Sequence, residues 1–369
     1  MEKIRIAILA SNFIRIPPRP KDIPPQCSGA PEMMTSIIAE NLVERGHDVT
    51  LFASGDSKTK GKLISVTEKA TGTDPKIGFN PTGPQPHANY EYLLISKAYQ
   101  MAKKNHFDII HSQLDIPTAF FAPLTKTPTI STLHSPLSRT RQLILGNFKN
   151  TQYYISISNA QRKPLPDLNY AATIYHGIDS KKIPFDKNPE DFLVITGRIH
   201  PNKGIKEAIM VAKKTGKKLI LMGSHGRNDE YWKKDIKPEI DGRQIIYKGF
   251  LGHEEMFKII KKAAAYILPL QWEEPFGLTM IETMACGTPV IAFDRGSVPE
   301  IIKNEKTGFI CRPNDLDSMV KAIKRIYRMP EKEYLEMRYR CRKSVEEKFT
   351  VERMVSEHEK VYRKILKTK

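Results

Sequence analysis

The chain has 369 residues, of which 40% are hydrophobic, and it carries a formal net charge of +18. This length is enough for two domains with substantial cores, and no apolar run reaches the roughly 18 residues of a membrane-spanning helix. The N-terminus does not have the pattern of a signal peptide, and the four cysteines have neither zinc-ligand nor disulfide spacing. We therefore expect a cytoplasmic protein. The charge leaves nucleic acid, an anionic membrane surface and anionic small substrates as candidate partners.

The first half of the chain alternates short apolar runs with amphipathic stretches, the pattern of a parallel α/β sheet. The expected strands are residues 3–10, 48–53, 107–111, 129–133, 153–158 and 173–175. The expected helices are residues 31–46, ended by Gly46, and 88–105. Residues 72–86 are rich in glycine, proline and threonine, and this composition predicts a loop.

A second alternating set begins at Phe192. Its expected strands are residues 192–196, 218–222, 244–248, 265–270, 289–293 and 308–311. Its expected helices are residues 203–214, 254–264, a helix that begins after Gly277, and residues 315–328. The charged tail at residues 331–369 has helical periodicity.

The stretch between the expected strands at residues 265–270 and 289–293 combines a loop with the start of a helix. Pro275 and Gly277 interrupt the chain, and apolar residues then recur at helical spacing. The free amides and the dipole at such a helix start favour an anion. Glu274 in the loop and Glu282 in the helix add two carboxylates, which suits a diphosphate with hydroxyl groups at both ends, such as a nucleotide sugar. Taken alone, two glutamates at this spacing are more typical of solvated charges beside a core helix.

A second charged loop follows the strand at residues 192–196. Arg198 and Lys203 lie between this strand and the next helix, where both could reach an anion, Arg198 as a fork and Lys203 as a point charge. In a chain with this net charge, such a pair by itself is more typical of an exposed surface.

These motifs resemble those of the family 4 retaining glycosyltransferases. The resemblance is carried by Glu-Pro-Phe-Gly-Leu from Glu274, Glu-Thr-Met-Ala-Cys-Gly-Thr-Pro from Glu282, and Gly-Ser-Val-Pro-Glu from Gly296. The Gly-Arg and Lys-Gly pairs around Arg198 and Lys203 match the family's diphosphate clamp. Residues 27–32 and 44–56 resemble its first βαβ unit, although Ala30 replaces the second of two usual glycines.

The resemblance covers nearly the whole chain and implies two Rossmann-like α/β domains that face each other across a cleft, the GT-B architecture. The expected division is an acceptor-binding domain at residues 1–182, a nucleotide-sugar-binding domain at residues 183–330, and C-terminal helices at residues 331–369. In the family, the last of these helices crosses back onto the N-terminal domain.

The resemblance also implies a role for each matching residue. The expected catalytic residues are His134, Arg198, Lys203 and Glu274, with His134 contacting the donor sugar near the reacting carbon. Arg198 and Lys203 would hold the diphosphate, Glu274 the sugar hydroxyls and Glu282 the ribose. The remaining expected contacts with the nucleotide sugar are Gly29, Phe250, Leu251, Phe276, Gly277 and Leu278. His134 alone could be structural, and the loop at Phe250 could be a simple turn.

The implied reaction transfers a sugar, with retention, from a nucleoside-diphosphate sugar to an acceptor hydroxyl, and a UDP-sugar is the preferred donor. We expect no metal or other cofactor, because the single Asp-x-Asp at Asp315 and Asp317 is better explained by helix capping. The acceptor could be a glycan, a small molecule or a lipid-linked molecule.

Two other functions remain as alternatives: a basic nucleic-acid-binding protein, supported by the net charge alone, and a nucleotide-sugar epimerase with the same architecture. Salt-dependent binding would reveal the first, and conversion of the donor without an acceptor would reveal the second. We expect no nucleic-acid binding. Peripheral contact with the inner membrane face is a further alternative. The basic residues that could provide it are Lys97, Lys103, Lys104, Arg139, Arg141, Arg162 and Lys163.

Overall fold

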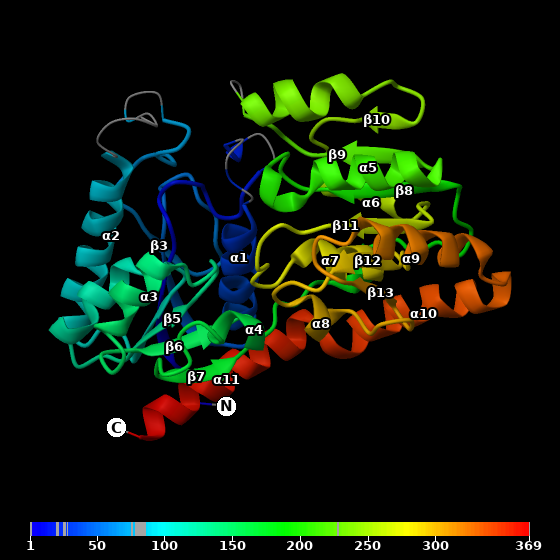
Figure 1. Cartoon of the computed structure of the whole chain (residues 1–369). Coiled ribbons are helices and arrows are strands. Elements are labelled where there is room, and N and C mark those ends of the chain that lie inside the picture. Colours follow the sequence, from blue (N-terminus) through cyan, green and yellow to red (C-terminus); the bar gives the residue numbers. More distant parts are fainter. Residues whose placement is uncertain are drawn as a thin grey trace. The chain divides into compact units, whose positions relative to one another are not determined.

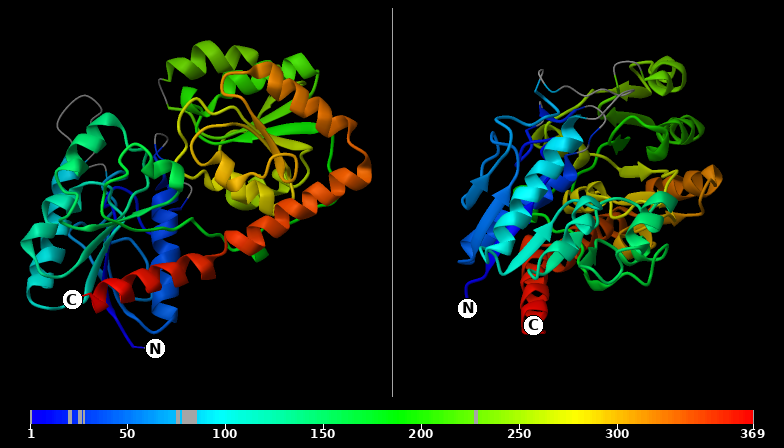
Figure 2. Two further views of the ribbon diagram at one scale, coloured as in Figure 1. Left: turned by 60° about the horizontal axis from the view of Figure 1, so that its bottom comes forward. Right: turned by 90° about the vertical axis from the view of Figure 1, so that its left-hand side faces the viewer.

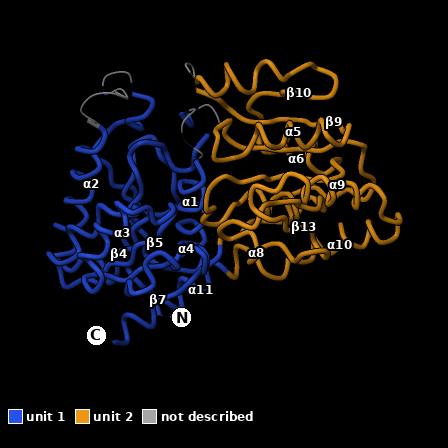
Figure 3. The backbone as a smooth tube through the Cα atoms, viewed as in Figure 1, with its two compact units in different colours: residues 1–175, 354–369 blue, residues 176–353 orange. Residues whose placement is uncertain are grey.

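The structure, a computed structural model, describes residues 2–368 except 20–21, 25–26, 28, 75–76, 78–85 and 227–228. Most of the loop expected at residues 72–86, and residue 28 of the first βαβ motif, lie outside the described residues. The chain forms two compact units: residues 1–175 with 354–369, called unit 1, and residues 176–353, called unit 2 (Figure 3). The first unit thus ends at residue 175, before the boundary expected at 182, and includes most of the last helix.

Unit 1 contains a seven-stranded parallel sheet in the order β3-β2-β1-β4-β5-β6-β7. Its strands are β1 (Arg5–Leu9), β2 (Asp48–Phe52), β3 (Lys62–Ile64), β4 (Ile109–Ser112), β5 (Thr129–Thr132), β6 (Tyr153–Ser156) and β7 (Tyr170–Thr173). From β1 the chain proceeds to β2 and β3 on one side, and β4 then pairs with the other side of β1. This reversal creates a switch point between β1 and β4. Strands β5, β6 and β7, which continue the sheet beyond β4, are labelled in Figure 1.

Helices cover both faces of this sheet. They are α1 (Ala30–Glu44), α2 (Pro86–Lys103), α3 (Arg139–Gly146), α4 (Asn159–Arg162) and α11 (Val351–Lys367), with 3-10 turns η2 (Pro117–Phe120) and η3 (Ala122–Leu124). Ile110 packs in a core cluster with Leu94 and Ile95 of α2. The next residue, His111, points to the opposite face because side chains alternate along a strand, and it contacts Tyr362 of α11. The last helix, red in Figure 2, therefore packs against unit 1.

Unit 2 contains a six-stranded parallel sheet in the order β10-β9-β8-β11-β12-β13. Its strands are β8 (Phe192–Thr196), β9 (Lys218–Met222), β10 (Ile245–Tyr247), β11 (Ala265–Leu268), β12 (Val290–Phe293) and β13 (Gly308–Cys311). They are almost entirely buried, as expected for a sheet covered on both faces. Two doubly wound α/β sheets confirm the expected fold class.

The helices of unit 2 are α5 (Ile205–Thr215), α6 (His253–Ile260), α7 (Leu278–Ala285), α8 (Val298–Ile301), α9 (Leu316–Arg328) and α10 (Glu331–Lys348). Shorter turns are η4 (Ser180–Lys182), η5 (Pro201–Lys203), the π-helical η6 (Trp232–Ile236) and η7 (Lys237–Glu239). One core cluster joins α5 and α9 to alternate residues of the strands, among them Leu193 and Ile267. Helices α7 and α10 pack against each other. The fully buried Arg338 of α10 donates to the carbonyls of Lys261 and Ala263 after α6.

Candidate functional site

The loops that follow the strands of unit 2 gather at one edge of its sheet, because all six strands run in the same direction. At this edge β8 and β11 are neighbours, while the chain continues from β8 to β9 on one side and from β11 to β12 on the other. Open α/β sheets bind their ligands at such a switch point. The loop after β8 carries Lys203, and the loop after β11 carries Glu274.

Lys203 and Glu274 are in direct contact. The Lys203 ammonium donates a hydrogen bond of 2.5 Å to Glu274 Oε2, and the two side chains are only 19% and 11% exposed. Trp272 Nε1 donates to the same oxygen over 3.1 Å, and its ring centroid lies 4.9 Å from the ammonium. Trp272, which sequence analysis missed, thus completes a cluster that fixes the position of the Lys203 charge.

Gly204 allows the loops after β8 and β11 to approach each other. Its φ of 70° is left-handed, and a Cβ at this position would lie 1.9 Å from the Pro269 carbonyl oxygen. Next to it, the backbone amide of Gln271 donates a hydrogen bond of 2.9 Å to the backbone carbonyl of Asn202. A side chain at residue 204 would therefore separate the two loops that bring Lys203 to Glu274.

The backbone at Glu274 is held by the loop after β12. The Ser297 amide donates to the Glu274 carbonyl over 3.0 Å, and the Ser297 hydroxyl donates to the Phe276 carbonyl over 2.6 Å. A Cβ on Gly296 would lie 2.2 Å from the Glu274 oxygen. The Gly-Ser segment at residues 296–297 therefore sets the shape of the Glu274 loop.

The start of α7 lies directly after this loop. Gly277 is its N-cap in a left-handed conformation with a φ of 80°, and Leu278 is the first helical residue. No described side chain caps this helix end, so its first amides are available to an anion. The Phe276 side chain, by contrast, is 2% exposed and packs against His176 at a ring distance of 5.1 Å. Phe276 could thus reach a ligand only through its backbone.

Glu282 lies one turn into α7 and is half-buried. Burial raises the pKa of its carboxyl, and the nearby His253 opposes this effect only in part. A carboxyl whose pKa is raised by desolvation gains from hydrogen-bond donors, such as the hydroxyl groups of a ligand.

Arg198 is half-exposed in the loop after β8. The loop is anchored beside it, because Ile199 is 2% exposed and its amide donates to the Ser224 carbonyl over 2.8 Å. Burial lowers the pKa of His200, and the Arg198 charge adds to this effect. Arg198 and Lys203 thus extend from one loop, as their spacing predicted.

Phe250 follows β10 at the same edge of the sheet and is 51% exposed. The preceding Gly249 has a φ of 73°, and its carbonyl accepts a hydrogen bond of 2.8 Å from the Gly223 amide. Leu251 is half-buried. An exposed aromatic ring on an anchored loop offers a flat apolar surface to a planar ligand.

In unit 1, Gly29 lies at the start of α1. It has a left-handed φ of 69°, and a Cβ there would lie 2.6 Å from Ile23 Cδ1. Ala30 is already the first helical residue. The alanine that replaces the family's second glycine therefore lies in helical backbone and needs no positive φ.

His134 follows β5 in unit 1. Its amide donates to Asp115 Oδ1 over 2.6 Å, and its ring Nε2 lies 2.9 Å from Gln113 Oε1. Burial lowers the pKa of the His134 imidazole, although the Asp115 carboxylate opposes this shift. Gln113 and Asp115, neither of which was expected from the sequence, hold His134 at the carboxyl edge of the unit 1 sheet.

Two of the basic residues considered for membrane contact have partners within unit 1. Arg141 donates to Asp115 Oδ2 over 2.5 Å, and the Arg162 guanidinium lies 4.2 Å from the Tyr170 ring centroid. Within the described residues, none of the helices combines the length and the hydrophobicity that a membrane crossing requires.

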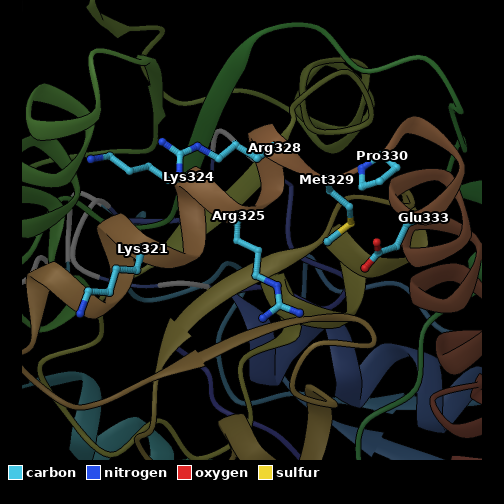
Figure 4. A pocket seen from close by; sticks show the side chains of 7 residues that line it. All are labelled: Lys321, Lys324, Arg325, Arg328, Met329, Pro330 and Glu333. Atoms are coloured by element: carbon cyan, nitrogen blue, oxygen red, sulfur yellow. The ribbon is translucent and has the colours of Figure 1, made fainter.

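A basic hollow of about 420 Å³ lies along α9 of unit 2 (Figure 4). It is lined by Lys321, Lys324, Arg325, Arg328, Met329, Pro330 and Glu333. Arg325 pairs with Glu305 over 3.1 Å, and none of the expected site residues lines the hollow. The opposite side of α9 is apolar and buried, so these cations form the solvated face of an amphipathic helix.

The Asp-x-Asp sequence has a structural explanation. Asp315 caps α9 by accepting from the Ser318 amide over 2.9 Å, and it pairs with Arg312. Asp317 pairs with Lys214 over 3.0 Å. Among the described residues, no group of three or more histidine, cysteine or acidic side chains is arranged to hold a metal ion.

The sequence profile described as Glycosyl transferases group 1 matches residues 178–347, and the profile Glycosyltransferase Family 4 matches residues 32–182. The N-acetyl-alpha-D-glucosaminyl L-malate synthase of Bacillus anthracis is 24% identical in an alignment that covers 89% of this chain and 92% of that protein. An uncharacterized glycosyltransferase of Methanocaldococcus jannaschii is also 24% identical, with 93% and 96% coverage.

Two solved structures show the same fold. The sucrose-phosphate synthase of Thermosynechococcus elongatus has a TM-score of 0.77 at 19% identity and covers 100% of both chains. Anabaena HepE, solved with UDP and glucose, has a TM-score of 0.74 at 17% identity and covers 98% of this chain and 100% of that one. The two solved structures show that the chain has the GT-B fold. The two profiles, which together span residues 32–347, show that the chain belongs to the family 4 glycosyltransferases.

Proposed function

We propose that this glycosyltransferase takes its sugar from a nucleoside-diphosphate sugar and transfers it to an acceptor hydroxyl with retention and without a metal ion. The observation that carries this proposal is the fixed Lys203 ammonium in the loop after β8, which is held by Glu274 and Trp272 of the loop before α7. Arg198 in the same loop as Lys203 and the amides at the start of α7 supply further positive potential at this edge of the sheet.

The leaving diphosphate gains negative charge as the bond to the sugar breaks. Arg198, Lys203 and the α7 amides are positioned before the reaction begins, so they stabilise this charge more strongly in the transition state than in the ground state. This preorganisation replaces the neutralisation that a metal ion provides in other transferases. The capping and pairing of Asp315 and Asp317 support the same conclusion.

The two glutamates take different roles in this proposal. Glu274, buried and paired with Lys203, accepts hydrogen bonds from sugar hydroxyls through the rest of its carboxylate. Glu282, whose pKa is raised by burial, accepts hydrogen bonds from the ribose hydroxyls. Phe250 provides a surface for the nucleobase, with Leu251 beside it. Gly277 and Leu278 approach the diphosphate through their backbone amides.

Retention requires that the acceptor attacks on the face from which the diphosphate leaves. The bond between the anomeric carbon and the phosphate oxygen breaks through an oxocarbenium-like transition state, and the acceptor oxygen bonds to the same carbon. The departing phosphate oxygen takes the acceptor's proton on that face. The family resemblance assigns His134 to the donor sugar near this carbon, and it assigns Gly29 a contact with the nucleotide sugar.

A UDP-sugar is the preferred donor. The structure of Anabaena HepE in complex with UDP and glucose supports this choice, since it shows a protein of the same fold with this nucleotide. The acceptor remains a hydroxyl compound of the glycan, small-molecule or lipid-linked class. Contact with an anionic membrane also stays a prediction, and fewer basic residues support it because Arg141 and Arg162 have intramolecular partners.

A thermal-shift screen of UDP-, GDP- and ADP-sugars tests the donor assignment. A ligand at about 100 times its Kd stabilises the protein by roughly 2.7 kcal/mol, which is a readily measured shift in Tm. We expect one nucleotide class to raise Tm in the wild type and to do so much less in Lys203→Ala. The matched control is Lys214→Ala, which breaks the exposed pair with Asp317. Equal shifts in both variants would remove Lys203 from the nucleotide site.

A further inference from the structure

The histidine expected at the donor sugar is connected to the last helix of the chain through buried side chains. His111, on β4, is fully buried beneath α11. The Tyr362 hydroxyl of α11 lies 2.6 Å from His111 Nδ1, and the Thr132 hydroxyl lies 2.8 Å from His111 Nε2. A hydroxyl can donate or accept, so both ring nitrogens are satisfied in either neutral tautomer. The ring is thereby held at both of its edges.

Gln113 lies over the face of this ring. Its side-chain nitrogen is 2.9 Å from His111 Nε2 and 3.3 Å from His111 Nδ1. An atom in the ring plane and bonded to one nitrogen would be much farther from the other, so the near-equal distances place the amide above the ring. Burial lowers the pKa of His111 well below its usual range, and the nearby His358 and His134 add to this effect. The face of a neutral imidazole attracts N–H donors and repels a carbonyl oxygen.

The orientation of the Gln113 amide then determines the proton position on His134. With its nitrogen over His111, the amide presents Oε1 to His134 Nε2 at 2.9 Å. A carbonyl oxygen only accepts, so His134 must carry its proton on Nε2. The opposite amide orientation would require the proton on Nδ1.

We propose that Tyr362 is a positioning residue that sets the tautomer and orientation of His134 through His111 and Gln113. Tyr362 and Thr132 fix the His111 ring, the ring face orients the Gln113 amide, and the amide oxygen holds His134 in its Nε2–H form. The four residues Tyr362, His111, Gln113 and His134 all belong to unit 1, although Tyr362 and His111 are 251 residues apart in the sequence. The consequence for turnover rests on the proposed role of His134 at the donor sugar.

Nitrogen NMR of the histidine rings tests the tautomer directly. The protein, labelled with ¹⁵N-histidine, is compared as wild type and as Tyr362→Phe, and the His134 signals are identified by their loss in His134→Gln. We expect wild-type His134 to show a protonated Nε2 and an unprotonated Nδ1. In Tyr362→Phe, where the His111 ring can turn, we expect the two His134 shifts to move toward each other.

Tyr99→Phe is the matched control, because Tyr99 is also buried in unit 1 and its hydroxyl lies 2.9 Å from Thr129 Oγ1. Both variants lose one buried hydroxyl, and Tm is measured for both. His134 shifts that stay at their wild-type values in a folded Tyr362→Phe would overturn the proposal. Equal changes in Tyr99→Phe would overturn it as well, since they would indicate general loosening of the core.

Kinetics tests the link to catalysis. The kcat for release of the nucleoside diphosphate should be about fivefold lower in Tyr362→Phe, the effect of one lost hydrogen bond. The KM for the nucleotide sugar should not change. Gln113→Met, which removes the His134 partner while keeping similar volume, should reduce kcat at least as much. Altered His134 shifts with unchanged kcat would overturn the catalytic part of the inference. If the wild type releases no diphosphate from any nucleotide sugar, the proposed function fails, but the NMR comparison still decides whether Tyr362 positions His134.

Discussion

Replacing Lys203 with methionine removes the ammonium while keeping most of the side-chain length. The lost ion pair to Glu274 is short, 2.5 Å, and both side chains are largely buried. Two unit charges 4 Å apart attract each other by about 4 kcal/mol at an effective dielectric constant near 20, but removing them from water costs several kcal/mol. We therefore expect a net coupling between the two side chains of about 1–3 kcal/mol in unfolding free energy.

A double-mutant cycle measures this coupling. Lys203→Met alone leaves the Glu274 carboxylate with Trp272 as its remaining hydrogen-bond donor among the contacts described above, so it should destabilise the protein more than the pair Lys203→Met and Glu274→Gln. Urea unfolding of the wild type, both single variants and the double variant provides the four values. A coupling indistinguishable from zero would mean that the ion pair does not organise the loop.

The effect on turnover is separate and larger. Without the Lys203 charge, kcat/KM for the nucleotide sugar should fall at least about 100-fold, which corresponds to about 2.7 kcal/mol of transition-state stabilisation. Arg198→Ala should have a loss of similar size, whereas Lys214→Met, on the exposed side of α5, should be close to wild type. Near-normal turnover in Lys203→Met or Arg198→Ala would refute the assignment of that residue to the diphosphate clamp.

Three other predictions concern the approach of the two loops, the buried carboxyl of Glu282 and the need for a metal ion. Gly204→Ala should cost more than 3 kcal/mol, because a Cβ would overlap the Pro269 carbonyl at 1.9 Å, whereas Gly216→Ala, with a similar φ of 66° and no atom within 4 Å, should cost about 1 kcal/mol in urea unfolding. Glu282→Gln should bind the nucleotide more weakly yet be more stable at neutral pH. Because burial raises the folded pKa of this carboxyl, its ionisation destabilises the fold as pH rises through that pKa, and the advantage of glutamine should vanish below the ordinary pKa of 4.5; a pH-independent difference would contradict this reasoning. Activity should survive excess EDTA, and Asp317→Asn should change it little, while loss with chelator and recovery with Mg²⁺ or Mn²⁺ would disprove metal independence.

The sequence predicted most of the fold because its strands are long apolar runs and its helices have a clear period. Two expected strands, residues 192–196 and 218–222, match β8 and β9 in full. The elements that were missed are short or polar. β3 has only three residues and lies at the edge of its sheet. α3 has eight residues, which include two arginines and two weak helix formers, Thr140 and Gly146. Such segments form because neighbouring elements hold them, which local sequence does not reveal.

Motif spacing also predicted that Arg198 and Lys203 share one loop, but the contact of Lys203 with Glu274 depends on tertiary packing. It requires the approach of two loops at Gly204, far from Glu274 in the sequence. Trp272 could have been suspected, since it lies two residues before Glu274 in the same loop. Gln113 likewise follows His111 by two residues, and so shares its face of the sheet. The role of Tyr362 had no local signal.

Real-time proton NMR of donor hydrolysis, with water as the acceptor, tests both retention and the class of the donor. The wild-type enzyme is incubated with the α-linked nucleotide sugar that gives the largest thermal shift, and the anomer of the released sugar is recorded before mutarotation. We expect release of nucleoside diphosphate together with the α-anomer, followed by slow appearance of the β-anomer. Initial release of the β-anomer would contradict retention, and no release from any nucleotide sugar would contradict the proposed donor class.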